Sequence, residues 1–189
     1  MNSQEVPSKP THHEGALKLL FDSCSLITAS KFKLQDRLVL DYILKISEIH
    51  IPEEVRNETT RLRDKYADAR EIEKRINRGD IKVHKVKSQQ KFEAELEHYK
   101  IDPGEKEAIL LYLYENSFDF LIVDDHLAFI VCNRFGVKAR FFLDLIVHFT
   151  NMGMLERDTA FGIIEAVRTR YAEGFVTHSI SMINRGDTK

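Results

Sequence analysis

The sequence predicts an α/β protein with a mainly parallel central sheet, followed by additional C-terminal helices. Short, almost continuously apolar runs indicate strands that are buried on both faces. The segments between these runs carry apolar residues at helical spacing, and alternating strands and helices are typical of parallel sheets with right-handed crossovers. The length of 189 residues, with 43% hydrophobic and 31% charged residues, suits one compact domain with a modest appendage.

Composition limits the environment that we expect for the chain. Residues 1–15 are polar and contain Pro7 and Pro10, which predicts a flexible N-terminal tail. The net charge of -2 neither indicates nor excludes nucleic-acid binding. Cys24 and Cys132 are too few for a disulfide framework, and no apolar run is long enough for a membrane span or a signal peptide. We therefore expect a cytoplasmic protein with no membrane association.

Five strands are expected, and the first and fourth end directly before aspartates. Leu17–Phe21 stops at Asp22, and residues 120–123 stop at Asp124. The other three predicted strands are residues 48–51, 81–86 and 137–141.

Helical spacing predicts the segments between the strands. One stripe of a predicted helix consists of Leu34, Leu38, Tyr42 and Ile46. A charged helix begins near Pro52, ends near Gly79, and has a stripe of Leu62, Tyr66, Ala69 and Ile76. Residues 104–116 are apolar on most sides, as in a helix packed deep against a sheet.

The apolar spacing after the last strand predicts helices to the end of the chain. We expect a domain over residues 16–150 and a helical extension over residues 151–189, with two stripes separated by Gly174. The first stripe contains Ala160, Ile163, Ile164, Val167 and Tyr171, and the second contains Val176, Ile180 and Ile183. These helices either cover a face of the sheet or form an oligomer or partner surface.

Carboxylates are the distinctive chemical feature. Glycine-rich phosphate loops, the nucleophile elbow and the H-E-x-x-H zinc motif are all absent from the sequence. The carboxyl ends of parallel strands and the helix N-termini that follow them meet at one edge of a sheet. The acids that we expect at this edge are Asp22, Glu58, Glu105, Asp124 and Asp125, with Glu53, Glu54 and Glu107 close by.

Each acid alone could simply cap a helix, but the group requires another explanation. Asp102 and Glu105 have the spacing of a capping box, and Asp124 or Asp125 could cap the helix that follows. Several carboxylates in one crevice repel one another unless a cation neutralises them. Oxygen ligands select hard ions, so we expect one or two Mg²⁺ or Mn²⁺ ions.

Four motifs occur in order: LLFDSCSLI at residues 19–27, IPEEVRNE at 51–58, PGEKEAI at 103–109 and LIVDD at 121–125. In this order they resemble the motifs of PIN-domain proteins over about residues 17–150. The resemblance is closest to the prokaryotic, VapC-toxin-like branch, in which the third acid occurs as Gly-Glu-x-Glu-Ala-Ile.

The resemblance implies a three-layer α/β/α sandwich and a Mg²⁺- or Mn²⁺-dependent endoribonuclease that hydrolyses RNA. By position, the metal-binding and catalytic acids would be Asp22, Glu58, Glu105, and Asp124 or Asp125. Glu54 and Glu107 stay open as alternatives to Glu58 and Glu105, because the sequence leaves the helix register uncertain by one turn. Relatives often act as toxins, which implies an antitoxin partner, and the charged insert at residues 61–80 suggests a lid or a homodimer arm.

Two other functions compete with this hypothesis. The first is a noncatalytic PIN-like module for binding or dimerisation. The second is a phosphoacceptor of the receiver or dehalogenase kind. The dehalogenase kind needs a second aspartate two residues after the first, and Cys24 stands at that position.

Further polar residues are candidates for the site. Ser23 or Ser25 could orient a water, His126 could take part in proton transfer, and the candidate phosphate contacts are Lys106, Arg134 and Arg140.

Overall fold

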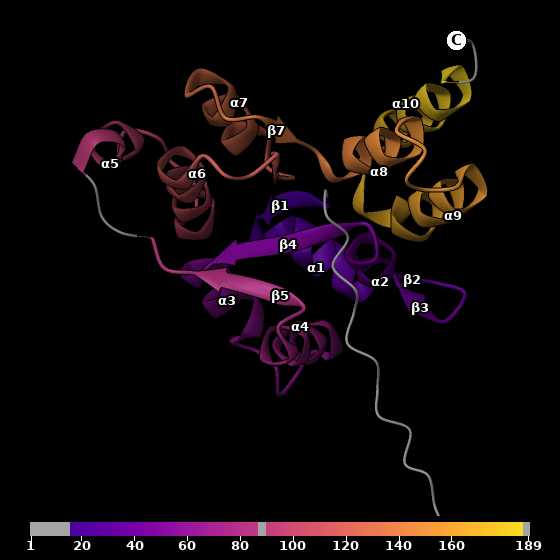
Figure 1. Cartoon of the computed structure of the whole chain (residues 1–189), viewed down its shortest axis with the longest axis horizontal. Coiled ribbons are helices and arrows are strands. Elements are labelled where there is room, and N and C mark those ends of the chain that lie inside the picture. Colours follow the sequence, from indigo (N-terminus) through magenta and orange to yellow (C-terminus); the bar gives the residue numbers. More distant parts are fainter. Residues whose placement is uncertain (1–15, 87–89, 187–189) are drawn as a thin grey trace, which may run out of the picture.

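A five-stranded parallel sheet forms the centre of the protein (Figure 1). The structure is a computed structural model and describes residues 16–86 and 90–186; the predicted tail at residues 1–15 lies outside this part. The strands are β1 (Leu17–Phe21), β4 (Ser47–Pro52), β5 (Ile81–His84), β6 (Phe120–Ile122) and β7 (Ala139–Arg140). Their order is β5-β4-β1-β6-β7, and every pair is parallel. The predicted fold class is confirmed.

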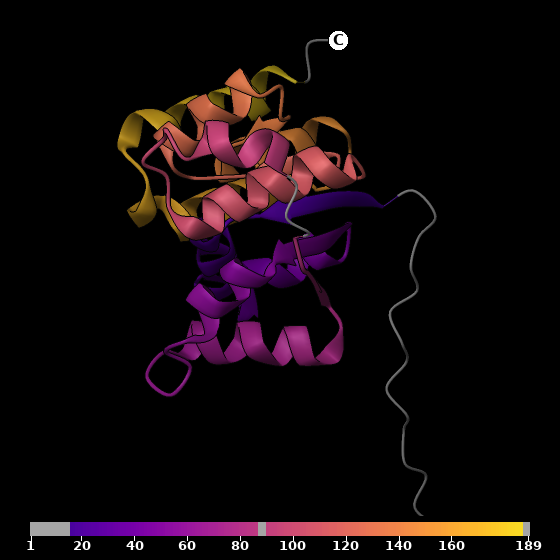
Figure 2. The ribbon, with the colours of Figure 1, turned by 90° about the vertical axis from the view of Figure 1, so that its left-hand side faces the viewer.

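Helices cover both faces of the sheet, so the protein has three layers (Figure 2). Leu19 and Phe21 of β1 face one core, whereas Leu20 between them faces the other, as the alternation of side chains along a strand requires. The first core includes α1 (Ser23–Lys31), α2 (Val39–Leu44), α3 (Glu53–Thr60) and α4 (Ala67–Arg78). The second core includes α5 (Gln90–Leu96), α6 (Pro103–Glu115) and α7 (His126–Arg134).

The C-terminal helices lie together at one side of the molecule (Figure 1). They are α8 (Phe142–Asn151), α9 (Arg157–Val167) and α10 (Glu173–Arg185), with a short 3-10 turn, η1 (Arg168–Arg170), between α9 and α10. Ile164 and Val176 are fully buried in the same apolar cluster as Leu19 and Phe21 of β1. The helices therefore share a core with the sheet, and the boundary at residue 150 stays a prediction.

Acidic residues begin several helices at the carboxyl end of the sheet. Asp22 follows β1 and caps α1 by accepting a hydrogen bond from the Ser25 backbone N–H. Asp125 caps α7 in the same way, through the Ala128 N–H. Asp102 and Glu105 form a capping box at the start of α6. These caps explain why the acids occur where strands end and helices begin.

The helix predicted along the stripe from Leu34 to Ile46 is wrong in its first half. The strands β2 (Lys33–Leu34) and β3 (Arg37–Leu38) form an antiparallel hairpin, and α2 begins only at Val39. The hairpin turns through left-handed residues at Gln35 and Asp36, with φ of 49° and 62°. Leu34 and Leu38 still pack against the core, so both are apolar, and their spacing matches that of one helix face.

The single charged helix predicted from Pro52 to Gly79 is also wrong, because a turn divides it into α3 and α4. Leu62 and Tyr66, which the stripe placed on the buried face, are 42% and 54% exposed. The turn rotates the chain between the two helices, so an apolar pattern that continues across it no longer describes one face. The end of α4 at Gly79 is confirmed, with Gly79 in the left-handed conformation at φ 81°.

Two smaller predictions need correction. Gly174 does not separate the C-terminal helices, because it lies in the first turn of α10. Tyr171 does not belong to the α9 stripe; it follows η1 with an extended backbone, at φ -125° and ψ 152°. Across the described residues, no helix is long and apolar enough to cross a bilayer.

Candidate functional site

Asp22 lies at the centre of the acidic edge. Its side chain is 1% exposed, and both oxygens accept backbone hydrogen bonds: Oδ1 from Ser25 N at 2.7 Å and Oδ2 from Asp124 N at 3.1 Å. Burial raises the pKa of Asp22 to about 7, and the charge of Asp124 adds to the rise. The second bond also connects the end of β1 with the end of β6.

Glu105 lies close enough to Asp22 and Asp125 to interact with both electrostatically. Burial raises the pKa of Glu105 to about 7, and the charges of Asp125 and Asp22 raise it further. One oxygen of Glu105 accepts the Asp102 N–H at 3.0 Å, which fixes the side chain over the start of α6. Two predicted acids from other segments, Asp22 and Asp125, thus lie within electrostatic range of Glu105.

Glu58 reaches the same edge from α3. Its carboxylate accepts hydrogen bonds from the Ser23 hydroxyl and from the Gly104 N–H, the latter at 3.0 Å. A Cβ at Gly104 would lie 2.5 Å from Oε2 of Glu58, so this close approach needs glycine. Glu58 therefore borders the group and connects α1, α3 and α6.

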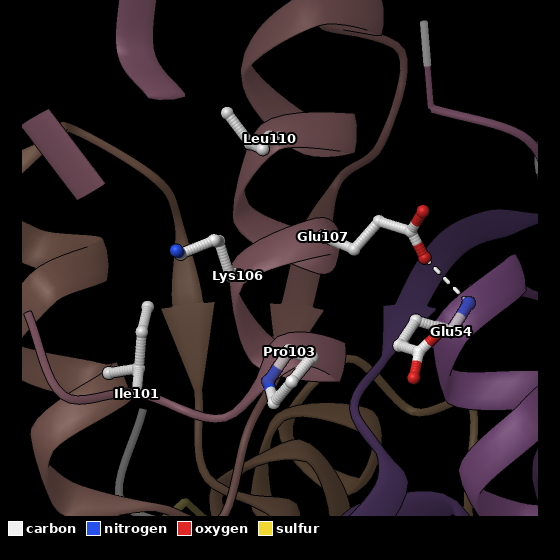
Figure 3. A pocket seen from close by; sticks show the side chains of 6 residues that line it. All are labelled: Glu54, Ile101, Pro103, Lys106, Glu107 and Leu110. Carbon is white, nitrogen blue, oxygen red and sulfur yellow. Dashed lines mark hydrogen bonds between the residues drawn. The ribbon is translucent and has the colours of Figure 1, made fainter. Parts of the chain in front are cut away.

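The alternative acids occupy a neighbouring pocket instead (Figure 3). Oε2 of Glu107 accepts the Glu54 N–H at 2.6 Å. Both residues line a pocket of about 320 Å³, together with Ile101, Pro103, Lys106 and Leu110. None of the five predicted site acids lines this pocket.

Asp124 is held by two groups that the sequence did not indicate. Its Oδ1 accepts the Phe142 N–H at 3.0 Å, and its Oδ2 accepts the Tyr171 hydroxyl at 2.6 Å. Burial raises the pKa of Asp124, while the bond from Tyr171 and the charge of Arg170 oppose the rise. One available signal was the hydroxyl itself, since a tyrosine within an apolar stripe needs a polar partner when it is buried.

The predicted basic residues and His126 form their contacts apart from this group. Lys106 forms an ion pair with Glu97 at 2.7 Å. Arg134 and Arg140 lie over aromatic rings, Arg140 at 4.2 Å from the centre of the Phe120 ring. His126 is exposed at the start of α7. The two predicted serines lie within the site: the Ser23 hydroxyl donates to Glu58, and the Ser25 N–H donates to Asp22.

The chemistry of the acidic group fits a hard divalent cation. The donors are carboxylate oxygens, and the raised pKa values of Asp22 and Glu105 reflect buried negative charge that a cation would neutralise. Among the described residues, no three His, Cys, Asp or Glu side chains surround a common point at ligating distance. Backbone N–H groups and hydroxyls hold the carboxylates in this arrangement.

The fold and the acidic edge define an α/β protein whose carboxylates gather where parallel strands end. A sequence model described as a PIN domain matches residues 19–184. The chain therefore belongs to the PIN-domain family, as the ordered motifs predicted, while its assignment to the VapC-like branch stays a prediction. No curated protein matches the chain. PIN domains are generally nucleases and typically use divalent metals.

Proposed function

We propose that the protein is a Mg²⁺- or Mn²⁺-dependent ribonuclease that hydrolyses phosphodiester bonds in RNA. The observation that carries the proposal is the position of Asp22, a buried carboxylate that interacts with Asp124 and Glu105 from two other segments. Such a group is costly to bury without a compensating charge. A divalent cation would supply that charge and the chemistry typical of the family.

Asp22, Glu105 and Asp125 are the residues that would hold the ion. Asp125 uses Oδ1 to cap α7, and Asp22 is fixed by two backbone bonds. When bound, the ion would supply Lewis acidity that activates water and stabilises the leaving oxygen. Glu58 and Ser23 would border the reacting phosphate and orient water by their shared hydrogen bond.

RNA as the substrate, an antitoxin partner and a homodimer are parts of the proposal that rest on the family resemblance. An antitoxin would cover the acidic edge, and its removal would expose the carboxylates to RNA. The pocket beside Glu54 and Glu107 adjoins this edge and offers room for a partner side chain or a nucleotide.

The decisive experiment compares Asp22→Asn with Asp119→Asn. Asp119 accepts the Lys18 N–H at 2.7 Å at the opposite end of the strands, so the second variant controls for the loss of one carboxylate. We expect wild type and Asp119→Asn to bind Mn²⁺ in calorimetry and to cleave labelled RNA. Asp22→Asn should lose Mn²⁺ binding and at least about a hundredfold in cleavage rate, since a catalytic metal contributes several kcal/mol.

Circular dichroism would establish that both variants are folded. Mn²⁺ binding without cleavage of single-stranded or structured RNA would favour a noncatalytic binding module. Equal Mn²⁺ binding by wild type and folded Asp22→Asn would contradict the proposed metal site. Phosphorylation of Asp22 by acetyl phosphate, seen in the intact mass, would support the phosphoacceptor function instead.

A further inference from the structure

The turn between α9 and α10 is attached to the acidic edge. Tyr171 follows η1, and its hydroxyl donates to Oδ2 of Asp124 at 2.6 Å. The Asp124 N–H in turn donates to Asp22 at 3.1 Å. Arg168 at the start of the turn forms ion pairs with Glu165 and Glu173. Two hydrogen bonds thus connect Tyr171 to the most buried acid, and the ion pairs of Arg168 link the turn to α9 and α10.

Arg170 lies on this turn, directly before Tyr171. It is exposed and forms no hydrogen bond or ion pair with any residue in the described ranges 16–86 and 90–186. Its charge acts on both Asp124 and Cys24, which places the guanidinium within electrostatic reach of the site. An exposed guanidinium therefore lies within electrostatic reach of the carboxylates.

The basic residues that the sequence suggested as phosphate contacts are engaged elsewhere. Lys106 is paired with Glu97, Arg134 lies over Tyr99, and Arg140 lies over Phe120. A phosphate that approaches several carboxylates is repelled unless positive charge lies at the edge of the site. A guanidinium suits this task because it donates two parallel hydrogen bonds to phosphate oxygens.

We infer that Arg170 binds a phosphate of the RNA beside the bond that is cut, and that Tyr171 is the positioning residue that holds the turn against Asp124. This inference rests on the proposed nuclease function and assigns part of its substrate binding to the C-terminal segment. The phosphate contact is independent of base identity.

The test measures RNA binding separately from cleavage. Binding of a fluorescein-labelled single-stranded RNA would be followed by anisotropy at several salt concentrations, with Mn²⁺, in a Glu105→Gln background that suppresses cleavage. Arg170→Ala should weaken binding about fivefold, the effect of losing one exposed charged contact. The slope of log K against log salt should fall by about 0.7, as expected for one lost phosphate contact on a single strand. Arg170→Lys should retain the slope because it retains the charge.

Arg78→Ala is the matched control, because Arg78 is an exposed arginine at the end of α4, in a different part of the fold. Equal slopes for Arg170→Ala and Arg78→Ala would overturn the inference, even if wild type cleaves RNA. If wild type neither binds nor cleaves RNA, the proposed function itself fails, and the inference fails with it.

Tyr171→Phe tests the positioning role. The variant keeps the ring and removes the bond to Asp124, so RNA binding should weaken about twofold to fivefold. In the Arg170→Ala background the same substitution should have no further effect, because both act on one contact. Additive losses in this double-mutant cycle would show that Tyr171 does not act through Arg170.

Discussion

Asp22 illustrates how a single side chain can serve both folding and chemistry. It caps α1, receives the Asp124 N–H, and is 1% exposed, so each structural role also removes the carboxylate from water. Burial and the charge of Asp124 then raise its pKa to about 7. A purely structural cap is more often solvated and does not carry this cost.

The choice between Glu105 and Glu107 leads to a first prediction at this scale. Glu105 interacts with Asp22 and Asp125, whereas Glu107 accepts the Glu54 N–H in the neighbouring pocket. We expect Glu105→Gln to lower the initial rate of Mn²⁺-dependent RNA cleavage at least about a hundredfold, and Glu107→Gln to lower it less than about threefold. The opposite ranking would move the catalytic position from Glu105 to Glu107 on α6.

A histidine pair lies away from the acidic edge. Nδ1 of His50 on β4 lies 2.8 Å from Nε2 of His84 on β5, and His50 is 5% exposed. Burial lowers the pKa of His50 to about 4, and the charges of His84 and Lys82 act in the same direction, while Glu48 opposes them. His50 is therefore neutral in the folded protein at neutral pH.

This pair predicts a pH-dependent loss of stability. The pKa of His50 is about 4 in the folded state against 6.5 ordinarily, so the unfolded chain binds more protons between these values. The contribution of His50 to the free energy of unfolding is fully present above pH 6.5. It is lost as the pH falls toward 4, and the loss is on the order of 3 kcal/mol. Urea unfolding should show the stability advantage of wild type over His50→Gln shrinking over this range.

Phe175, an exposed side chain that does not titrate, provides the control for that experiment. The difference in free energy of unfolding between wild type and Phe175→Ala should stay constant over the same pH range. A constant difference for His50→Gln as well would contradict the assignment of the loss to His50.

At the level of elements, the start of α6 determines how closely α3 can approach. Gly104 is buried beneath the carboxylate of Glu58 and donates its N–H to it. The atoms that a Cβ would meet are the end of a flexible side chain, which can move. A substitution there displaces Glu58 more readily than it unfolds the helix.

Gly104→Ala should therefore separate activity from stability. We expect RNA cleavage to fall about tenfold to a hundredfold, because a displacement of about 1 Å in a catalytic group has effects of this size. The free energy of unfolding should change by less than about 1 kcal/mol, the helix-propensity difference between the two residues. Gly174→Ala, in the first turn of α10 with open space around it, is the control and should leave cleavage unchanged.

Elements with strong local signals were predictable from sequence. The sequence signal lies within a few residues for three features: the apolar run of β1, the capping box of α6 and the left-handed Gly79 that ends α4. The hairpin at Gln35 was not predictable. Leu34 and Leu38 both contact the core, and their spacing in the sequence is the same as that of residues on one face of a helix. The position of Tyr171 was missed for a related reason, since its partner Asp124 lies 47 residues away in sequence.

At the scale of the whole molecule, one core joins the sheet to the C-terminal helices. Ile164 of α9 is 0% exposed in the same cluster as Leu19 of β1, and the PIN-domain match extends to residue 184. Helices packed in this way should unfold together with the sheet.

Ile164→Ala tests that cooperativity. The cavity should lower the free energy of unfolding of the entire protein by about 2 to 5 kcal/mol. Because the chain has no tryptophan, far-UV circular dichroism and tyrosine fluorescence would follow urea unfolding, and we expect both to show one transition. Phe175→Ala, at a side chain that is 60% exposed, should change stability by less than about 0.5 kcal/mol. Two separate transitions would instead indicate an independent extension after residue 150.

The bond from Tyr171 to Asp124 also sets an order of events during translation. The ribosome makes Asp22, Glu105 and Asp125 well before Arg170 and Tyr171, and nascent chains begin to fold from the N-terminal side. On the proposed function, the growing polypeptide would carry the acids before it carried the phosphate contact of Arg170 and the tyrosine that positions it.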